Sequence, residues 1–269
     1  MTTIHREDHE GRDRQHRDRT PVVGPNPPSA GQAGSVTVGR VAGIPIRVHW
    51  TFLLLISLIV VGGGNAGPGA IALGILWIVA LFGFVVAHEV SHCLMARRRG
   101  GVVADILLLP IGGVSRMTIM PEAPADELAV ALVGPVTSLV IGIGLLGTGI
   151  LTGVGIWPPT LFAGSWLVRL GWLNLVLGGF NLVPALPMDG GRVLRAALTA
   201  RRGRLEATVL VCRIARVVAF ALVAVGFLYD FWLVLIGLFV LLGAAAEEAA
   251  ARQAAPPPPS PQAAPPPPR

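Results

Sequence analysis

Six long apolar runs in the middle of the chain restrict its fold more than any other feature. An α-helix needs about 20 apolar residues to cross the hydrocarbon core of a bilayer. The second, third and fourth runs reach that length, and the shorter ones are flanked by Trp and Arg residues that suit membrane interfaces. The sequence therefore predicts an all-α polytopic membrane protein with six transmembrane helices. The runs are Val48–Gly64, Ile71–Met95, Leu128–Val154, Trp166–Pro184, Cys212–Tyr229 and Phe231–Ala246.

The composition argues against a soluble globular protein. Only 13% of the residues are charged, against about 25% in a typical soluble domain. The isoelectric point near 11.0 and the net charge of +6 would also suit a nucleic-acid-binding protein. However, the arginines lie beside apolar runs, which is typical of membrane topology, and we therefore expect the lipid bilayer and no nucleic acid as a partner. The two cysteines lie in apolar stretches and predict no disulfide.

The arginines alternate between the loops. The loops 97–127 and 185–211 carry four and five of them, whereas 65–70 and 155–165 carry none. Because cytoplasmic loops are enriched in Arg, six spans with this pattern place both termini in the cytoplasm. The absence of Lys, with abundant Ala and Arg, is typical of a GC-rich bacterial genome. We therefore expect an integral, multi-pass protein of a bacterial cell membrane.

Both ends of the chain differ from its middle. Residues 1–38 mix charges of both signs with Pro, Gly and Ser and predict a disordered leader. Residues 251–269 contain two proline tetrads and predict a disordered, extended tail, with a Pro-rich ligand for a partner as the alternative. The interval 39–250 is then the six-span domain.

One loop is unusual. Gly101–Met120 is too apolar for a solvated loop, and Pro110, Gly112 and Gly113 interrupt it too often for a span. Strand-like runs on both sides of its Pro-Ile-Gly-Gly segment predict a β-hairpin between the second and third spans. At membrane depth such a backbone is tolerated against protein or a wet cavity, so we expect the hairpin to be membrane-associated.

The second span ends in the pattern His-Glu-x-x-His. His88 and His92 are four residues apart, so both imidazoles lie on one helix face and can reach one metal ion. Glu89 is next to the first of them, in position to accept a proton from the water that a metal would activate. The alternative is a pair of histidines that only packs helices together. Three ionisable groups within five residues inside a bilayer favour the metal site.

A hydrolytic zinc site usually takes three protein ligands and leaves one position for water. Asp189 is the main candidate for the third ligand, because Pro184 and Pro187 interrupt the helix before it and two glycines after it allow a turn. The alternative is that Asp189 caps a helix beginning at Gly190. The remaining acids are interpreted as ordinary loop charges: Asp105, Glu122, Asp126, Glu127 and Glu206. Of these, Asp105 and Glu122 are the next candidates for the third ligand.

Together these motifs resemble the site-2 protease family of intramembrane zinc metalloproteases. In that family a His-Glu-x-x-His helix is paired with an Asn-x-x-Pro-x-x-x-x-Asp-Gly motif two spans later, here Asn181–Gly190. The segments Gly39–Trp50, LLPIGGVSRM and Ala131–Pro135 are similar to the compact six-span, sporulation-factor-like subgroup. The resemblance covers roughly residues 38–246.

The resemblance implies a role for each matching residue. His88, His92 and Asp189 would hold one Zn²⁺ per chain, Glu89 would be the general base, and Asn181 would position or polarise the carbonyl of the scissile peptide. The chain departs from many relatives at Ser138, where they have Asn. We also expect no CBS or PDZ-like domain, so substrate choice would come from the membrane core, the hairpin or a regulatory membrane partner.

The expected function is therefore regulated intramembrane proteolysis: the protein would hydrolyse a peptide bond in or near a transmembrane segment of another membrane protein. The hairpin would offer an edge on which an extended substrate adds as a strand, and proline at Leu107 or Leu109 would then abolish cleavage. Two alternatives stay open. One is a catalytically silent homologue that binds membrane clients, and the other is a divalent-metal transporter. The sequence gives no sign of the oligomeric state.

Overall fold

A computed structural model describes residues 34–63, 67–119, 123–159 and 164–254. Val36–Arg269 forms one compact unit, and of the separate unit Met1–Ser35 only the last two residues are described. The expected leader, 1–38, and tail, 251–269, lie largely outside the described residues. In the described parts of these two segments, strand β1 begins at Ser35 and helix α8 continues to Ala254. Regular structure therefore extends slightly beyond the interval 39–250 at both ends.

Four strands form one sheet in the order β1-β2-β3-β4, with β1 at Ser35–Val41 and β2 at Ile44–His49. Ala42 and Gly43, both with positive φ, form the tight connection between them, as two-residue hairpins require. β2 then pairs in parallel with β3, Val102–Leu109, about sixty residues later, with Ile46 opposite Ile106. β3 pairs antiparallel with β4, Gly112–Ile119.

This sheet corrects the prediction of an all-α fold. The expected hairpin within 101–120 is confirmed as β3 and β4, but β1 and β2 were not predicted. The first apolar run was expected to start a span at Val48, which instead lies in β2 opposite Leu108. Hydropathy could not separate Val48 from the following helix, because Val48 and the α2 residues Phe52 and Leu55 pack against the same apolar cluster.

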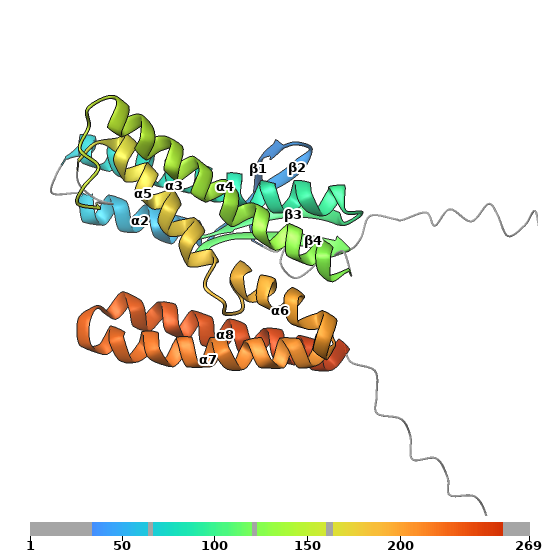
Figure 1. The fold of residues 1–269 in the computed structure, drawn as a ribbon. Helices are drawn as coiled ribbons and strands as arrows, with labels where there is room; N and C mark the ends of the chain where they lie inside the picture. Colours follow the sequence, from blue (N-terminus) through green and yellow to red (C-terminus); the bar gives the residue numbers. More distant parts are fainter. Residues whose placement is uncertain (1–33, 64–66, 120–122, 160–163, 255–269) are drawn as a thin grey trace, which may run out of the picture. The chain divides into compact units, whose positions relative to one another are not determined.

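The helices account for most of the remaining chain (Figure 1). Four of them, α3, α4, α7 and α8, are long and apolar enough to cross a bilayer. Two apolar runs gave shorter helices, α2 with 12 residues and α5 with 16, which at about 1.5 Å per residue are shorter than the hydrocarbon core. The helices are α2 Phe52–Gly63, α3 Pro68–Arg98, α4 Pro124–Leu151, α5 Trp166–Asn181, α6 Asp189–Arg202, α7 Arg204–Tyr229 and α8 Phe231–Ala254.

Two apolar clusters hold these elements together. The first packs α3 against the sheet, with Cys93 and Ile106 fully buried within it. The second joins the segment between α5 and α6 to α7 and α8, through fully buried residues such as Leu186 and Val240. α3, α4 and α5 contact one another, and α7 and α8 form an antiparallel pair (Figure 1). α4 and α6 are also in contact, which brings the end of α3 and the start of α6 to the same part of α4.

Candidate metal centre

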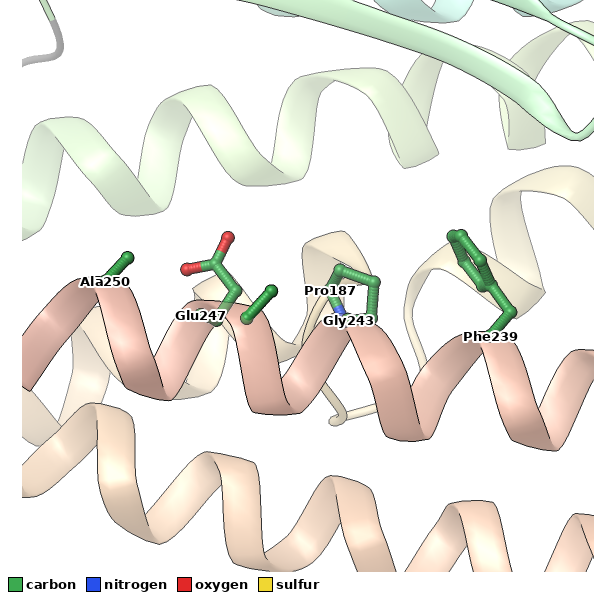
Figure 2. Close-up of a pocket in the computed structure, with 6 residues that line it drawn as sticks. Pro187, Phe239, Gly243, Glu247 and Ala250 are labelled. Atoms are coloured by element: carbon green, nitrogen blue, oxygen red, sulfur yellow. The ribbon is translucent and has the colours of Figure 1, made fainter.

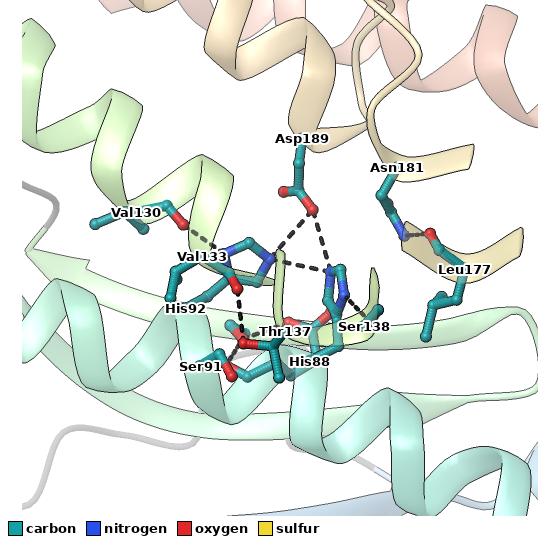
Figure 3. Close-up of polar contacts among 12 residues, drawn as sticks. His88, Ser91, His92, Val130, Val133, Thr137, Ser138, Leu177, Asn181 and Asp189 are labelled. Atoms are coloured by element: carbon teal, nitrogen blue, oxygen red, sulfur yellow. Dashed lines mark hydrogen bonds and ion pairs between the residues drawn. The ribbon is translucent and has the colours of Figure 1, made fainter. Parts of the chain in front are cut away.

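His88 and His92 lie one turn apart on α3 and are both buried. Their Nε2 atoms are 3.1 Å apart. Asp189, the first residue of α6, brings its Oδ2 to 3.2 Å from Nε2 of His88 and 3.1 Å from Nε2 of His92 (Figure 3). Three potential ligand atoms from two helices therefore converge on one point, although Asp189 lies 97 positions after His92 and 101 after His88.

The spacing of these atoms fits a tetrahedral zinc ion. Ligands about 2.0–2.1 Å from such an ion lie about 3.3 Å from each other, close to the distances within this cluster. Two imidazole nitrogens and one carboxylate oxygen are also a donor set that zinc accepts in hydrolytic sites, where three protein ligands leave a fourth position open. Among the described residues, this is the group of His and acidic side chains arranged to hold a metal ion.

The second nitrogen of each imidazole is held by α4. Nδ1 of His92 lies 2.6 Å from the carbonyl oxygen of Val130, and Nδ1 of His88 lies 3.0 Å from Oγ of Ser138. Because a carbonyl can only accept, Nδ1 of His92 carries a proton. Ser138, where relatives were expected to have Asn, thus contacts a histidine of the cluster.

Gly134 allows α4 to approach the two histidines. A Cβ atom at this position would lie 2.2 Å from Nε2 of His92 and 2.8 Å from Nε2 of His88. Any side chain here would therefore occupy the space in front of both ring nitrogens. Gly134 was not predicted as a site residue, although it lies four residues before Ser138 and so shares its helix face.

The segment before α6 brings Asp189 to the cluster. α5 ends at Asn181, and the chain folds back so tightly that a Cβ atom on Gly190 would lie 2.3 Å from the carbonyl oxygen of Leu182. The N-cap of α6 is Met188, and no side chain caps the helix. The alternative interpretation of Asp189 as an N-cap is therefore wrong. Instead, its carboxylate contacts the imidazoles.

The carboxyl group of Asp189 is ionised at neutral pH. Burial alone would raise its pKa, but the hydrogen bonds to His88 and His92 outweigh burial and hold the pKa below its usual range. A carboxylate that stays charged in a buried position needs compensating partners, and here the two imidazoles are those partners. An ionised carboxylate is also the form that binds a metal.

Glu89 is half-buried and turned toward the hairpin. Its carboxylate accepts a hydrogen bond from the hydroxyl of Ser115 in β4, and that hydroxyl accepts one from Sγ of Cys93 at 3.3 Å. A Cβ atom on Gly113 would lie 2.7 Å from Cγ of Glu89, so β4 packs directly on this side chain. The hairpin thus contacts the residue expected to be the general base.

Asn181 contacts its own helix. Its Nδ2 donates to the carbonyl oxygen of Leu177 at 2.9 Å, and Figure 3 draws it apart from the three clustered residues. Within the described part of the chain, no hydrogen bond joins it to His88, His92 or Asp189.

The other acidic candidates have different surroundings. Asp105 is buried in an ion pair with Arg116, and Glu127 is buried against Arg195, so their interpretation as ordinary loop charges is wrong. Arg116 lies opposite Asp105 in the neighbouring strand of the hairpin, and Arg195 lies 68 positions after Glu127; neither pairing has a local sequence signature. Asp126 pairs with Arg99 at 2.8 Å, and Glu206 is exposed. Glu122 lies outside the described residues.

A groove of about 420 Å³ lies beside the segment that leads to Asp189 (Figure 2). Pro187 forms one side of it. Five residues of α8 form the other side, and four of them, all except Ala246, follow one another at helical spacing along one face. α8 approaches so closely that a Cβ atom on Gly243 would lie 2.6 Å from Cγ of Pro187. The α8 residues are Phe239, Gly243, Ala246, Glu247 and Ala250.

Comparisons with known proteins agree with this geometry. The model of peptidase family M50 matches residues 76–165 and 160–226, which include the histidines, Asn181 and Asp189. The zinc metalloprotease MJ0392 of Methanocaldococcus jannaschii is 40% identical over 211 residues, which are 78% of this chain and 59% of that protein. A relative from Mycobacterium tuberculosis is 32% identical over 233 residues, 78% of this chain and 58% of its own length. The chain thus spans about three fifths of the length of these curated relatives.

A solved structure supports the same relationship. The site-2 protease from Methanocaldococcus jannaschii superimposes with a TM-score of 0.59 at 38% sequence identity. The match covers 80% of this chain and 95% of that structure. It therefore extends over nearly the whole of the solved chain.

Proposed function

Because the chain belongs to peptidase family M50, we propose that it is an intramembrane zinc metalloprotease. It would hydrolyse a peptide bond in or near a transmembrane segment of another membrane protein. The observation that carries this proposal is the cluster of His88, His92 and Asp189, in which two imidazole nitrogens and a carboxylate oxygen lie within 3.2 Å of one another. Two of these groups belong to an apolar helix long enough to span a bilayer.

One Zn²⁺ per chain would bind through Nε2 of His88, Nε2 of His92 and the Asp189 carboxylate. When bound, zinc polarises the carbonyl of the scissile peptide and lowers the pKa of water to about 7. The contacts from Val130 and Ser138 support this assignment, because they hold each Nδ1 and leave Nε2 directed at the shared point.

Glu89 would act as the general base. Its carboxylate would accept a proton from the attacking water and pass it to the nitrogen of the leaving amine. Its position next to His88 on the helix, one residue along, and the hydrogen bond from Ser115, which fixes the carboxylate, support this role. Ser115 was not predicted from the sequence, since a serine in a strand has no distinguishing pattern.

Asn181 would orient the scissile carbonyl. The amide nitrogen uses one of its two N–H groups on the carbonyl of Leu177, so the second remains able to donate to a substrate oxygen. This is compatible with a residue that holds substrate and makes no contact with the metal ligands.

The topology would be six spans, with both termini on the cytoplasmic side of a bacterial cell membrane. Four helices meet the length and hydropathy of a span, and α2 and α5 would be the two short ones. The alternation of Arg-rich and Arg-free loops supports the orientation. His92 is followed by Arg97 and Asp189 by Arg192, so both elements of the cluster approach an Arg-rich loop, consistent with a site near the cytoplasmic face.

An extended substrate segment would add to the edge strand β4. The strand order makes β4 an edge of the described sheet and places β3 inside it, between β2 and β4. Proline at Leu107 or Leu109, both in β3, would therefore disrupt the sheet itself and would not test substrate pairing. The contact of Ser115 with Glu89 supports β4 as the substrate side, because it joins this edge to the general base.

The test is zinc content followed by mapping of cleavage. Full-length protein purified in detergent is expected to hold about one zinc per chain, and less in His88→Ala and Asp189→Ala. In membranes of cells that express the wild type, new peptide termini are then expected within predicted spans of other proteins, and none with Glu89→Gln. Zinc-free, well-folded wild type would contradict the metal site. Identical termini with wild type and Glu89→Gln would contradict the protease.

A further inference from the structure

An ion pair between α4 and α6 is almost completely buried. Glu127 is 2% exposed and Arg195 is 5% exposed. Nε and Nη2 of Arg195 donate to Oε1 of Glu127 at 2.8 and 2.6 Å. Removing two charges from water is costly, and such pairs often add little net stability. We therefore consider how this pair fixes the position of α6 against α4.

The pair belongs to a small network. Nη1 of Arg195 donates to Glu247 of α8 at 3.2 Å, and Nη1 of Arg204, at the start of α7, lies 3.4 Å from Oε2 of Glu127. Four helices therefore meet at the Glu127 and Arg195 side chains. The guanidinium group suits this position because its planar set of N–H groups can serve several acceptors at once.

Glu127 shares a face of α4 with the groups that hold the histidines. Val130, Gly134 and Ser138 follow it by three, seven and eleven positions, which is the spacing of one helical face. Val130 and Ser138 orient the imidazoles of α3, and Glu127 holds α6. One face of one helix therefore contacts both elements that supply the cluster.

Arg195 lies six residues after Asp189 in the same helix. An α-helix is stiff over this length, so the point at which α6 is attached to α4 determines where its first residue lies. The tight packing of Gly190 against Leu182 prevents the preceding segment from extending to compensate. We propose that Arg195, through its ion pair with Glu127, is the positioning residue that keeps Asp189 within ligand distance of His88 and His92.

This inference rests on the proposed zinc site, and its test is a double-mutant cycle on zinc affinity. Full-length protein in detergent is titrated with zinc against a chromophoric chelator, as wild type, Arg195→Met, Asp189→Ala and the double variant. Arg195→Met is expected to lower zinc affinity by about 10- to 100-fold, as changes to residues that orient ligands do. In the Asp189→Ala background the same substitution is expected to change nothing further.

A matched control is Arg216→Met. Arg216 pairs with Glu248 between α7 and α8, and none of the described ion pairs joins it to α6, so its loss should leave zinc affinity unchanged. The absorption spectrum of the cobalt-loaded protein gives a second readout, because its visible bands depend on the ligand set. Arg195→Met is expected to shift these bands toward those of Asp189→Ala. Arg195→Lys, which keeps the charge, serves if Arg195→Met fails to fold, with a smaller loss expected.

The outcomes separate the inference from the function on which it rests. An equal loss from Arg195→Met in both backgrounds, or none in either, would overturn the positioning role while leaving the zinc site intact. Wild type without zinc affinity, or affinity untouched by Asp189→Ala, would instead overturn the proposed metal site. If Arg195→Lys changes neither the zinc affinity nor the cobalt spectrum, this result would also overturn the positioning role.

Discussion

Nδ1 of His92 lies 2.6 Å from the carbonyl oxygen of Val130, so a main-chain group orients this ring. The equivalent nitrogen of His88 is held by a side-chain hydroxyl, that of Ser138, at 3.0 Å. The two proposed ligands therefore differ in how they respond to mutation. No substitution removes the carbonyl at position 130, whereas the support of His88 depends on the residue at 138.

Ser138→Ala is expected to weaken zinc binding by about 10- to 100-fold, because the Nδ1 proton of His88 loses its acceptor and the ring becomes free to turn. Zinc affinity of the purified protein, measured by chelator competition, tests this. Thr137→Ala is the matched control on the neighbouring residue, since the hydroxyl of Thr137 contacts only the Val133 carbonyl of its own helix at 2.8 Å among the described hydrogen bonds. Equal affinities for Ser138→Ala and wild type would contradict the role of Ser138.

Gly134→Ala is expected to abolish zinc binding or reduce it strongly. The added Cβ would lie 2.2 Å from Nε2 of His92, so α4 or the ring must move, and overpacking of this kind costs about 1–3 kcal/mol. Gly144→Ala is the control on the same helix, because a Cβ there meets nothing within 4 Å. Zinc content and thermal unfolding of both variants provide the comparison. Full zinc occupancy in Gly134→Ala would show that the space in front of the histidines is not needed.

Glu89→Gln is expected to retain zinc and lose proteolysis, by about 10²- to 10⁴-fold, because the amide cannot accept the proton that general base catalysis requires. The measurements are zinc stoichiometry and the rate of appearance of cleaved substrate in reconstituted membranes. Glu206→Gln, at an exposed position in α7, should cleave as the wild type does. Zinc loss in Glu89→Gln would mean that Glu89 supports the metal site itself.

Cysteine cross-linking can identify the edge of the sheet that meets substrate. Val114 in β4 and Val36 in β1 are 46% and 70% exposed and lie on opposite edge strands. In the Glu89→Gln background, Val114→Cys is expected to form a disulfide with a substrate that carries a cysteine near its cleavage site, and Val36→Cys is not. Cross-linking through β1 alone would reverse the proposed direction of approach.

Much of the site could be predicted from the sequence because its residues carry local signatures. His88 and His92 share one turn, and Asp189 stands out by the prolines before it and the glycines after it. The structure brings all three together. The hairpin was also predictable, from two strand-like runs around a turn.

What escaped prediction depends on partners distant in sequence. β2 is a strand because β3, about sixty residues later, pairs with it, and apolar periodicity cannot show such a partner. Glu127 looked like a solvated loop charge, since nothing nearby indicates Arg195, which lies 68 positions later. The support of His88 by Ser138 depends likewise on a contact across 50 positions.

The arrangement of contacts along α4 has a consequence for the tolerance of this chain to insertions and deletions. A single face of this helix contacts both α6 and the two histidines, through Glu127, Val130, Gly134 and Ser138. One inserted residue would rotate everything after it by about 100°, so groups before and after the insertion could no longer face the same neighbours. This stretch is therefore fixed in length as well as in composition, and changes in chain length are far better accommodated in the connection between α4 and α5.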